Sequence, residues 1–226
     1  MAQLHENIKE LKQELFELFL MTIEQIKNSK KALENNNKSI AKVIIETEEK
    51  INKKELLIDE KCENILTLFN PVAKDLRRVL AIYKINHELE RIGDIADSIA
   101  DFVIDSEMKD GVDIKLLEET GLIEMFLVLI KMQKNVFASF KNNCPTSAIG
   151  VLEEDKKLNN INNSSIENLK NLINNDKVEL EVSYKLLTII KKLERAGDHL
   201  KNIAEEIVFS VNSEVIKHQN KRKISS

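Results

Sequence analysis

The sequence has little that would interrupt a helix and little that would build a sheet. Its 226 residues include only five Gly and two Pro, no Trp, and 4% aromatic residues. A sheet needs many turns, which Gly and Pro usually supply, so their scarcity leaves little room for one. Since 32% of the residues are charged, the composition favours long helices with a core of Leu, Ile, Val and Ala.

The usual signals of several functional classes are also missing. Cys62 and Cys144 have no metal or redox spacing and form no disulfide framework. The formal net charge of −4 excludes a globally basic nucleic-acid binder. The most apolar run, residues 122–130, contains a Glu and is far shorter than the ~20 residues of a membrane span. The first residues turn acidic and amphipathic, unlike a signal peptide. We therefore expect a cytoplasmic protein with no transmembrane segment and no nucleic-acid partner.

The sequence does contain one long internal repeat. The motif Glu-Arg-x-Gly-Asp occurs at 90–94 and again at 194–198, about 104 residues later. Apolar residues at helical spacing run through almost the whole chain, and Asn- or Pro-containing breaks interrupt them. The predicted helices are 8–33, 39–69 with Ser39 as N-cap, 71–105 with Asn70 as N-cap, 115–141, 145–174, and a last one capped by Asp176 and ending near 212.

Helices of about 30 residues extend ~45 Å, and the breaks between them are short, so neighbours must fold back antiparallel. The economical arrangement is all-α: two tandem three-helix bundles of six long antiparallel helices, related by an internal pseudo-twofold. We expect the first repeat at 1–108, the second at 109–212, and a basic, disordered tail at 213–226.

Acidic residues form a stripe along the third predicted helix. At ~100° per residue, Glu90, Asp94, Asp97 and Asp101 fall within about 60° of one another, on the flank of the apolar face. The last helix repeats the stripe with Glu194, Asp198 and Glu205, and Lys201 takes the place of Asp97.

Like charges one turn apart repel by a few tenths of a kcal/mol, and the helix dipole disfavours acids near a C-terminus. A bound cation would reverse both effects, because neighbouring carboxylates can share a hard divalent or trivalent metal. Glu48 and Asp155 lie at matching positions of the preceding helices and are further candidate ligands. Gly93 and Gly197 each cost ~1 kcal/mol inside a helix, which indicates that something approaches the backbone there.

Two other interpretations stay open. Arg91 precedes Asp94 by three residues, and Lys191 precedes Glu194 by three, so each motif could be a salt-bridged solvent face of a metal-free helical interaction module. A carboxylate-bridged dimetal oxidase of the ferritin type would need Glu-x-x-His pairs. Neither His87 nor His199 follows a Glu at that spacing, and a lone His beside a carboxylate is more often structural.

Residues 75–82 and 88–97, followed by 193–199 and 202–205, resemble the two signatures of the PhoU family of phosphate-uptake regulators, in the family's order. The similarity spans nearly the whole chain. It implies two three-helix bundles and multinuclear metal clusters bound through acid-x-x-x-Asp motifs. Iron is the metal implied first, and zinc, magnesium or manganese are alternatives. The implied ligands are Glu90, Asp94, Glu194 and Asp198, and further candidates are Asp97, Asp101, Asn202, Glu205, Glu48 and Asp155.

The resemblance also implies a function. Members of this family are negative regulators and not enzymes. They act with the phosphate ABC transporter to keep a membrane sensor histidine kinase inactive when phosphate is ample. The resemblance further implies a homodimer and peripheral contact with the inner membrane surface.

Overall fold

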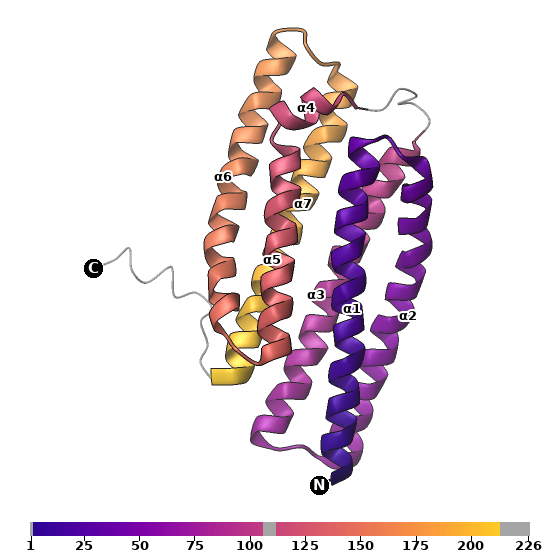
Figure 1. Cartoon of the computed structure of the whole chain (residues 1–226), viewed down its shortest axis with the longest axis vertical. Coiled ribbons are helices and arrows are strands. Elements are labelled where there is room, and N and C mark those ends of the chain that lie inside the picture. Colours follow the sequence, from indigo (N-terminus) through magenta and orange to yellow (C-terminus); the bar gives the residue numbers. More distant parts are fainter. Residues whose placement is uncertain (1, 106–111, 213–226) are drawn as a thin grey trace, which may run out of the picture.

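A computed structural model describes residues 2–105 and 112–212. In these ranges all of the regular secondary structure is helical (Figure 1), which confirms the predicted all-α class with about six long helices. The helices are α1 (Ala2–Glu34), α2 (Lys38–Phe69), α3 (Ala73–Ile104), the short α4 (Ile114–Glu119), α5 (Leu122–Asn142), α6 (Thr146–Asn174) and α7 (Leu180–Asn212).

Asparagine residues make the first two breaks, although not in the roles that the sequence suggested. Asn37, and not Ser39, is the N-cap of α2, because its side chain accepts hydrogen bonds from the backbone N–H groups of Ser39 and Ile40. Asn70 adopts a left-handed conformation with φ of 44° and closes α2, and it does not open the next helix. The third helix begins only at Ala73.

The predicted helix 115–141 is wrong in one respect, because it is two helices. Gly121 has φ of 72° and separates α4 from α5. An added Cβ at Gly121 would lie 3.1 Å from the Ser165 hydroxyl oxygen, so the turn packs closely against α6. The last helix also begins later than expected: Asp176 has φ of 52° and lies in the turn that precedes α7.

The helices form two antiparallel bundles that lie side by side (Figure 1). The first contains α1, α2 and α3, and the second contains α5, α6 and α7, with α4 at its upper end. Between the bundles, α3 packs against α7 and α1 packs against α5. The centre of the molecule therefore brings together α3 and α7, the two helices that carry the repeated motif.

The few aromatic residues are concentrated where α1 meets α5. Phe16 and Phe19 contact Phe137 and Phe140, with ring centroids 5.4–5.9 Å apart. Such pairs are worth about 0.5–1.5 kcal/mol beyond the area they bury. The bundle interiors consist mainly of Leu, Ile, Val and Ala, as the composition indicated.

Two expectations concern parts of the chain outside the described residues. The predicted boundary between the repeats falls within 106–111, and the basic tail falls within 213–226. In the part of the chain that the structure describes, no helix has the length and apolar character needed to span a membrane.

Candidate metal centre

Glu48 is the most unusual residue of the first bundle. It lies on α2, faces α3, and is only 6% exposed. Neither of its carboxylate oxygens has a hydrogen-bond partner among the described residues. A Cβ at Gly93 would lie 2.7 Å from Glu48 Oε2 and 3.3 Å from Oε1, so only glycine leaves room for this carboxylate. The close approach that the sequence predicted at Gly93 is therefore confirmed, and the approaching group is an acid.

Burial and the negative charges of three other carboxylates raise the pKa of Glu48. Burial raises its pKa from 4.5 to about 8, and the charges of Asp94, Asp97 and Glu90 contribute to this increase. Burial also raises the pKa of Asp97, and Asp101 and Asp94 raise it further. The pKa of Glu90 is raised by burial and by Asp94. We call Glu48, Glu90, Asp94 and Asp97 the first acidic group.

The first acidic group offers oxygen ligands of the kind that a hard cation prefers, but among the described residues no three of its ligand atoms lie within 4.8 Å of one another. A buried polar atom without a partner is rare in native structures, and a bound ion is one of its common explanations. Both oxygens of Glu48 are such atoms, and Asp97 supplies a third, since its Oδ1 is buried and has no hydrogen-bond partner among the described residues. Carboxylate oxygens are the ligands that magnesium, calcium, manganese and oxidised iron favour. A cation here would neutralise the repulsion that raises these pKa values.

The second bundle has a related but partly neutralised arrangement, which we call the second acidic group: Asp155, Glu194 and Asp198. Asp155 on α6 is 4% exposed, and its Oδ2 accepts a hydrogen bond of 3.2 Å from Lys201 Nζ. Burial raises the pKa of Asp198, and Asp155 and Glu194 raise it further, whereas Lys201 lowers it. Glu194 also pairs with Lys191 at 3.5 Å, as the solvent-face interpretation expected. The Lys201 ammonium therefore supplies, beside Asp155 and Asp198, part of the positive charge that a metal ion would supply.

The glycine of the second motif has a different neighbour. A Cβ at Gly197 would lie 2.2 Å from Leu158 Cδ2. The predicted close approach is present here too, but the approaching group is apolar. The two motifs therefore share their backbone packing and differ in whether a carboxylate or a methyl group occupies the space.

The remaining predicted ligands lie in several places. Asp101 is exposed and close enough to Asp97 to raise its pKa, and Glu205 is half-buried on α7. Asn202 turns toward the first bundle, where its amide donates a 3.3 Å hydrogen bond to Glu88 Oε1. His199 Nδ1 lies 2.6 Å from Glu88 Oε2. Asn202 and His199 therefore join the two bundles through one carboxylate.

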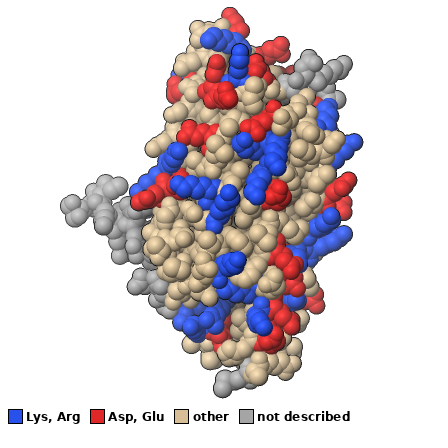
Figure 2. Space-filling view, in the orientation of Figure 1, with Lys and Arg blue, Asp and Glu red and all other residues tan. Residues whose placement is uncertain are grey.

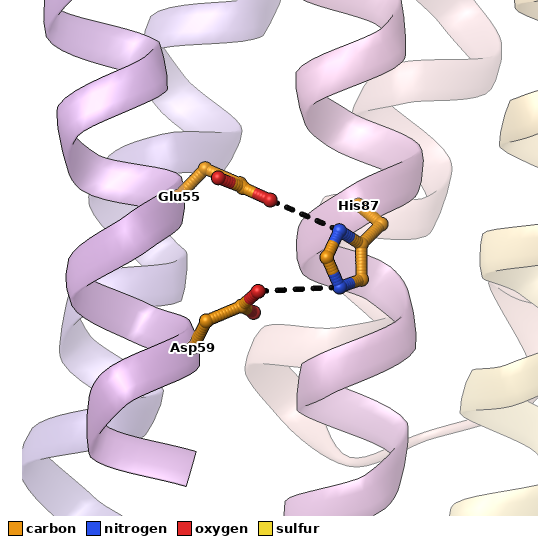
Figure 3. A group of neighbouring side chains, drawn as sticks. All are labelled: Glu55, Asp59 and His87. Atoms are coloured by element: carbon orange, nitrogen blue, oxygen red, sulfur yellow. Dashed lines mark ion pairs between the residues drawn. The ribbon is translucent and has the colours of Figure 1, made fainter. Parts of the chain in front are cut away.

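The structure also brings together a group that the sequence analysis did not single out. His87 on α3 lies between two acids of α2 (Figure 3): its Nδ1 is 3.0 Å from Glu55 Oε1 and its Nε2 is 3.3 Å from Asp59 Oδ2. One ligand atom from each residue lies within 4.8 Å of the others, so the three can hold a metal ion. Asn86 donates a 2.8 Å hydrogen bond to the other oxygen of Asp59 and orients it.

This His87 group adjoins the first acidic group, because the Glu55 charge also raises the pKa of Glu90. Glu55 and Asp59 have the same spacing as Glu90 and Asp94, and that spacing was visible in the sequence. The alignment that pairs Glu48 with Asp155 pairs Glu55 and Asp59 with two residues that cannot repeat the group, Asn162 and Ile166. The group therefore belongs to the first bundle alone.

Comparisons with known proteins agree with this architecture. The model of the PhoU domain matches residues 15–103 and 122–207, one match in each bundle. The chain is 26% identical over 202 residues to the phosphate-specific transport system accessory protein PhoU homolog 1 of Thermotoga maritima, covering 88% of this chain and 84% of that protein. It is 27% identical over 218 residues to the Escherichia coli K12 accessory protein PhoU, covering 96% and 88% respectively.

Two solved structures have the same fold. The regulatory protein PhoU of Streptococcus pneumoniae superimposes with a TM-score of 0.84 at 24% identity, covering 95% of this chain and 99% of that chain. The PhoU structure from Pseudomonas aeruginosa gives a TM-score of 0.83 at 25% identity, covering 93% and 99%.

Proposed function

The chain belongs to the PhoU family of phosphate-specific transport system accessory proteins, and on this premise we propose that it is a metal-binding regulatory adaptor. In this proposal it is a negative regulator of phosphate uptake and of phosphate-starvation signalling. Its partners are a phosphate ABC transporter and a sensor histidine kinase at the inner membrane surface. It works as a homodimer in the cytoplasm and catalyses no reaction.

The observation that supports metal binding is the state of Glu48. A carboxylate that is 6% exposed, unpartnered and surrounded by three other acids is unfavourable when ionised. A purely structural core would place an apolar side chain at this position. The sequence instead keeps an acid on α2 and a glycine on α3 that makes space for it.

The first acidic group and the His87 group suit different metals. The first contains only carboxylates, which favour hard cations such as oxidised iron, manganese or magnesium. The His87 group adds an imidazole, which zinc and iron(II) also accept. The second acidic group contains Lys201 next to Asp155, so we propose that it holds fewer ions than the first.

Elemental analysis of untagged protein tests the metal proposal. In the variant Glu90→Gln/Asp94→Asn we expect a lower content of iron or manganese, whereas His87→Gln lowers zinc selectively. The matched control is Glu46→Gln/Glu49→Gln, which removes the same charge from exposed positions beside Glu48. Equal metal content in all three variants and the unaltered protein would refute the assignment.

A genetic assay tests the regulatory role separately. Deletion of the gene should derepress phosphate-starvation genes in cells grown with ample phosphate, and the unaltered gene should restore repression. The Glu90→Gln/Asp94→Asn variant should restore it only in part if metal is required for docking to partners. Normal repression in the deletion strain would contradict the adaptor role, whatever the metal content of the protein.

A further inference from the structure

A cleft of about 480 Å³ lies between the two bundles, where α1 and α3 begin and α5 and α7 end. Figure 2 shows Lys and Arg side chains, with Asp and Glu side chains nearby, in this lower part of the molecule. Four cations line the cleft: Lys9, Lys12, Lys74 and Arg78. Among the described lining residues Asp75 is the one carboxylate, and it lies 3.5 Å from Arg78 Nη1. Lys9 also pairs with Glu6 at 3.5 Å, so the cleft carries a moderate excess of positive charge in a chain whose net charge is negative.

Lys12 holds its charge at the inner wall of this cleft. Its Nζ lies 5.3 Å from the ring centroids of both Phe16 and Phe140, and it donates a 3.0 Å hydrogen bond to Asn143 Oδ1. Burial lowers the pKa of the Lys12 ammonium, and the Arg78 guanidinium lowers it further. Two cations thus share a partly dehydrated space, and an anion between them would offset both effects.

The rest of the wall is apolar. Ile8, Ile82, Phe140, Ile207 and Val211 line it together with the cations. Ile8, Ile82, Phe140 and Ile207 are at most 8% exposed, and Val211 at the edge of the wall is 41% exposed. Inorganic phosphate would satisfy the cations but would leave this apolar edge in water. A volume of about 480 Å³ lies in the range of clefts that bind whole organic ligands. The cleft therefore suits a molecule with both an anionic part and an apolar or aromatic part.

We propose that this cleft binds a nucleotide. The phosphates would lie against Lys12, Lys74 and Arg78, since guanidinium and ammonium groups are the usual protein partners of phosphate. The base would cover the exposed edge of the apolar wall at Val211. Residues 213–226 carry four Lys and Arg side chains and one Glu, a charge that does not complement the cations of the cleft. The proposal does not depend on metal binding, because none of these residues belongs to the acidic groups.

Titration calorimetry of the full chain with ATP, adenosine and inorganic phosphate, in a metal-free buffer of low ionic strength, tests the proposal. We expect saturable binding of one ATP, weaker binding of phosphate and the weakest binding of adenosine. The variant Lys12→Gln/Arg78→Gln should raise the dissociation constant for ATP at least about tenfold, because hydrogen bonds to charged groups are strong. Added salt should weaken ATP binding in the unaltered protein.

Two more variants complete the test. Lys9→Gln/Lys74→Gln changes only exposed side chains, keeps the packing of Lys12, and should still weaken ATP binding several-fold. The control Lys50→Gln/Lys53→Gln removes the same charge from exposed positions of α2 outside the cleft and should bind ATP as the unaltered protein does.

Three results would overturn the proposal. The first is no saturable ATP binding at millimolar concentration. The second is equal ATP affinity in the unaltered protein and in both cleft variants. The third is that adenosine or phosphate binds as tightly as ATP does. Equal binding of adenosine would mean that the cations contribute nothing, and equal binding of phosphate would mean that the apolar wall contributes nothing.

Discussion

Replacing Glu48 with Gln should stabilise the metal-free protein at neutral pH. The change keeps the size of the side chain and removes the charge that burial and three neighbouring acids disfavour. The direction follows because neither oxygen of Glu48 has a hydrogen bond of good geometry within the described residues, and the nearby Gln25 amide, which donates to the Ile44 carbonyl, lowers the pKa less than burial and the neighbouring acids raise it.

The magnitude follows from the pKa. A carboxyl whose folded pKa is above its unfolded value lowers stability as the pH rises from the unfolded value toward the folded value. For Glu48 this window runs from 4.5 to about 8. Each unit inside the window costs about 1.4 kcal/mol. We therefore expect Glu48→Gln to gain about 3 kcal/mol over the unaltered protein between pH 5 and pH 8.

Urea denaturation in the presence of a chelator, repeated at pH 5, 6, 7 and 8, measures this gain. The quantity to follow is the difference in the free energy of unfolding between the two proteins, since titrating groups that do not interact with Glu48 cancel from it. Adding iron or manganese should make the unaltered protein the more stable of the two. The metal binds the folded state and so stabilises it, and Glu48→Gln should bind the metal less well and gain less.

Asp155→Asn is the matched control for this prediction. Asp155 occupies the corresponding position of the second bundle and is equally buried, but Lys201 donates to it at 3.2 Å. Its replacement breaks an ion pair and should not stabilise the protein. If the free-energy difference for Glu48→Gln does not change with pH, or if both variants behave alike, the unpaired state assigned to Glu48 is wrong.

Three other substitutions have defined outcomes. Gly197→Ala should lower the free energy of unfolding by about 1–3 kcal/mol, because the added Cβ would lie 2.2 Å from a Leu158 methyl. Alanine has the higher helix propensity, so a gain in stability would show that propensity outweighs the contact and would contradict the close packing. Lys201→Asp should raise the metal content of the second bundle by removing the cation beside Asp155, and unchanged elemental analysis would argue against the site. Glu88→Gln should cost about 2 kcal/mol at pH 7 by weakening the contact between the bundles. Burial alone would raise the pKa of Glu88, but hydrogen bonds from His199 and Asn202, together with nearby positive charge, outweigh burial and lower the pKa. This cost is therefore fully present above the unfolded value of 4.5 and should fade in denaturation experiments as the pH falls below that value.

The helices and their order could be predicted from the sequence because their causes are local. Apolar spacing and Asn- or Pro-containing breaks depend on neighbouring residues, and five of the predicted helices lie close to observed ones. The break at Gly121 could not be predicted in this way. Leu117 and Leu122 are both buried, so the apolar pattern continues across the turn, and the position of α6 decides the conformation there.

The sequence by itself determined the acidic stripes and the need for glycine beside them, since positions on one helix follow from its fixed geometry. Only the tertiary structure decided which acid is isolated and which is paired. Glu48 lies unpartnered against Gly93, whereas its counterpart Asp155 meets Lys201. Likewise His87 contacts two acids of α2, while His199 turns to the other bundle. These outcomes depend on how neighbouring helices are aligned along their axes. Core contacts between residues far apart in the sequence set that alignment, and the spacing of residues along one helix does not reveal it.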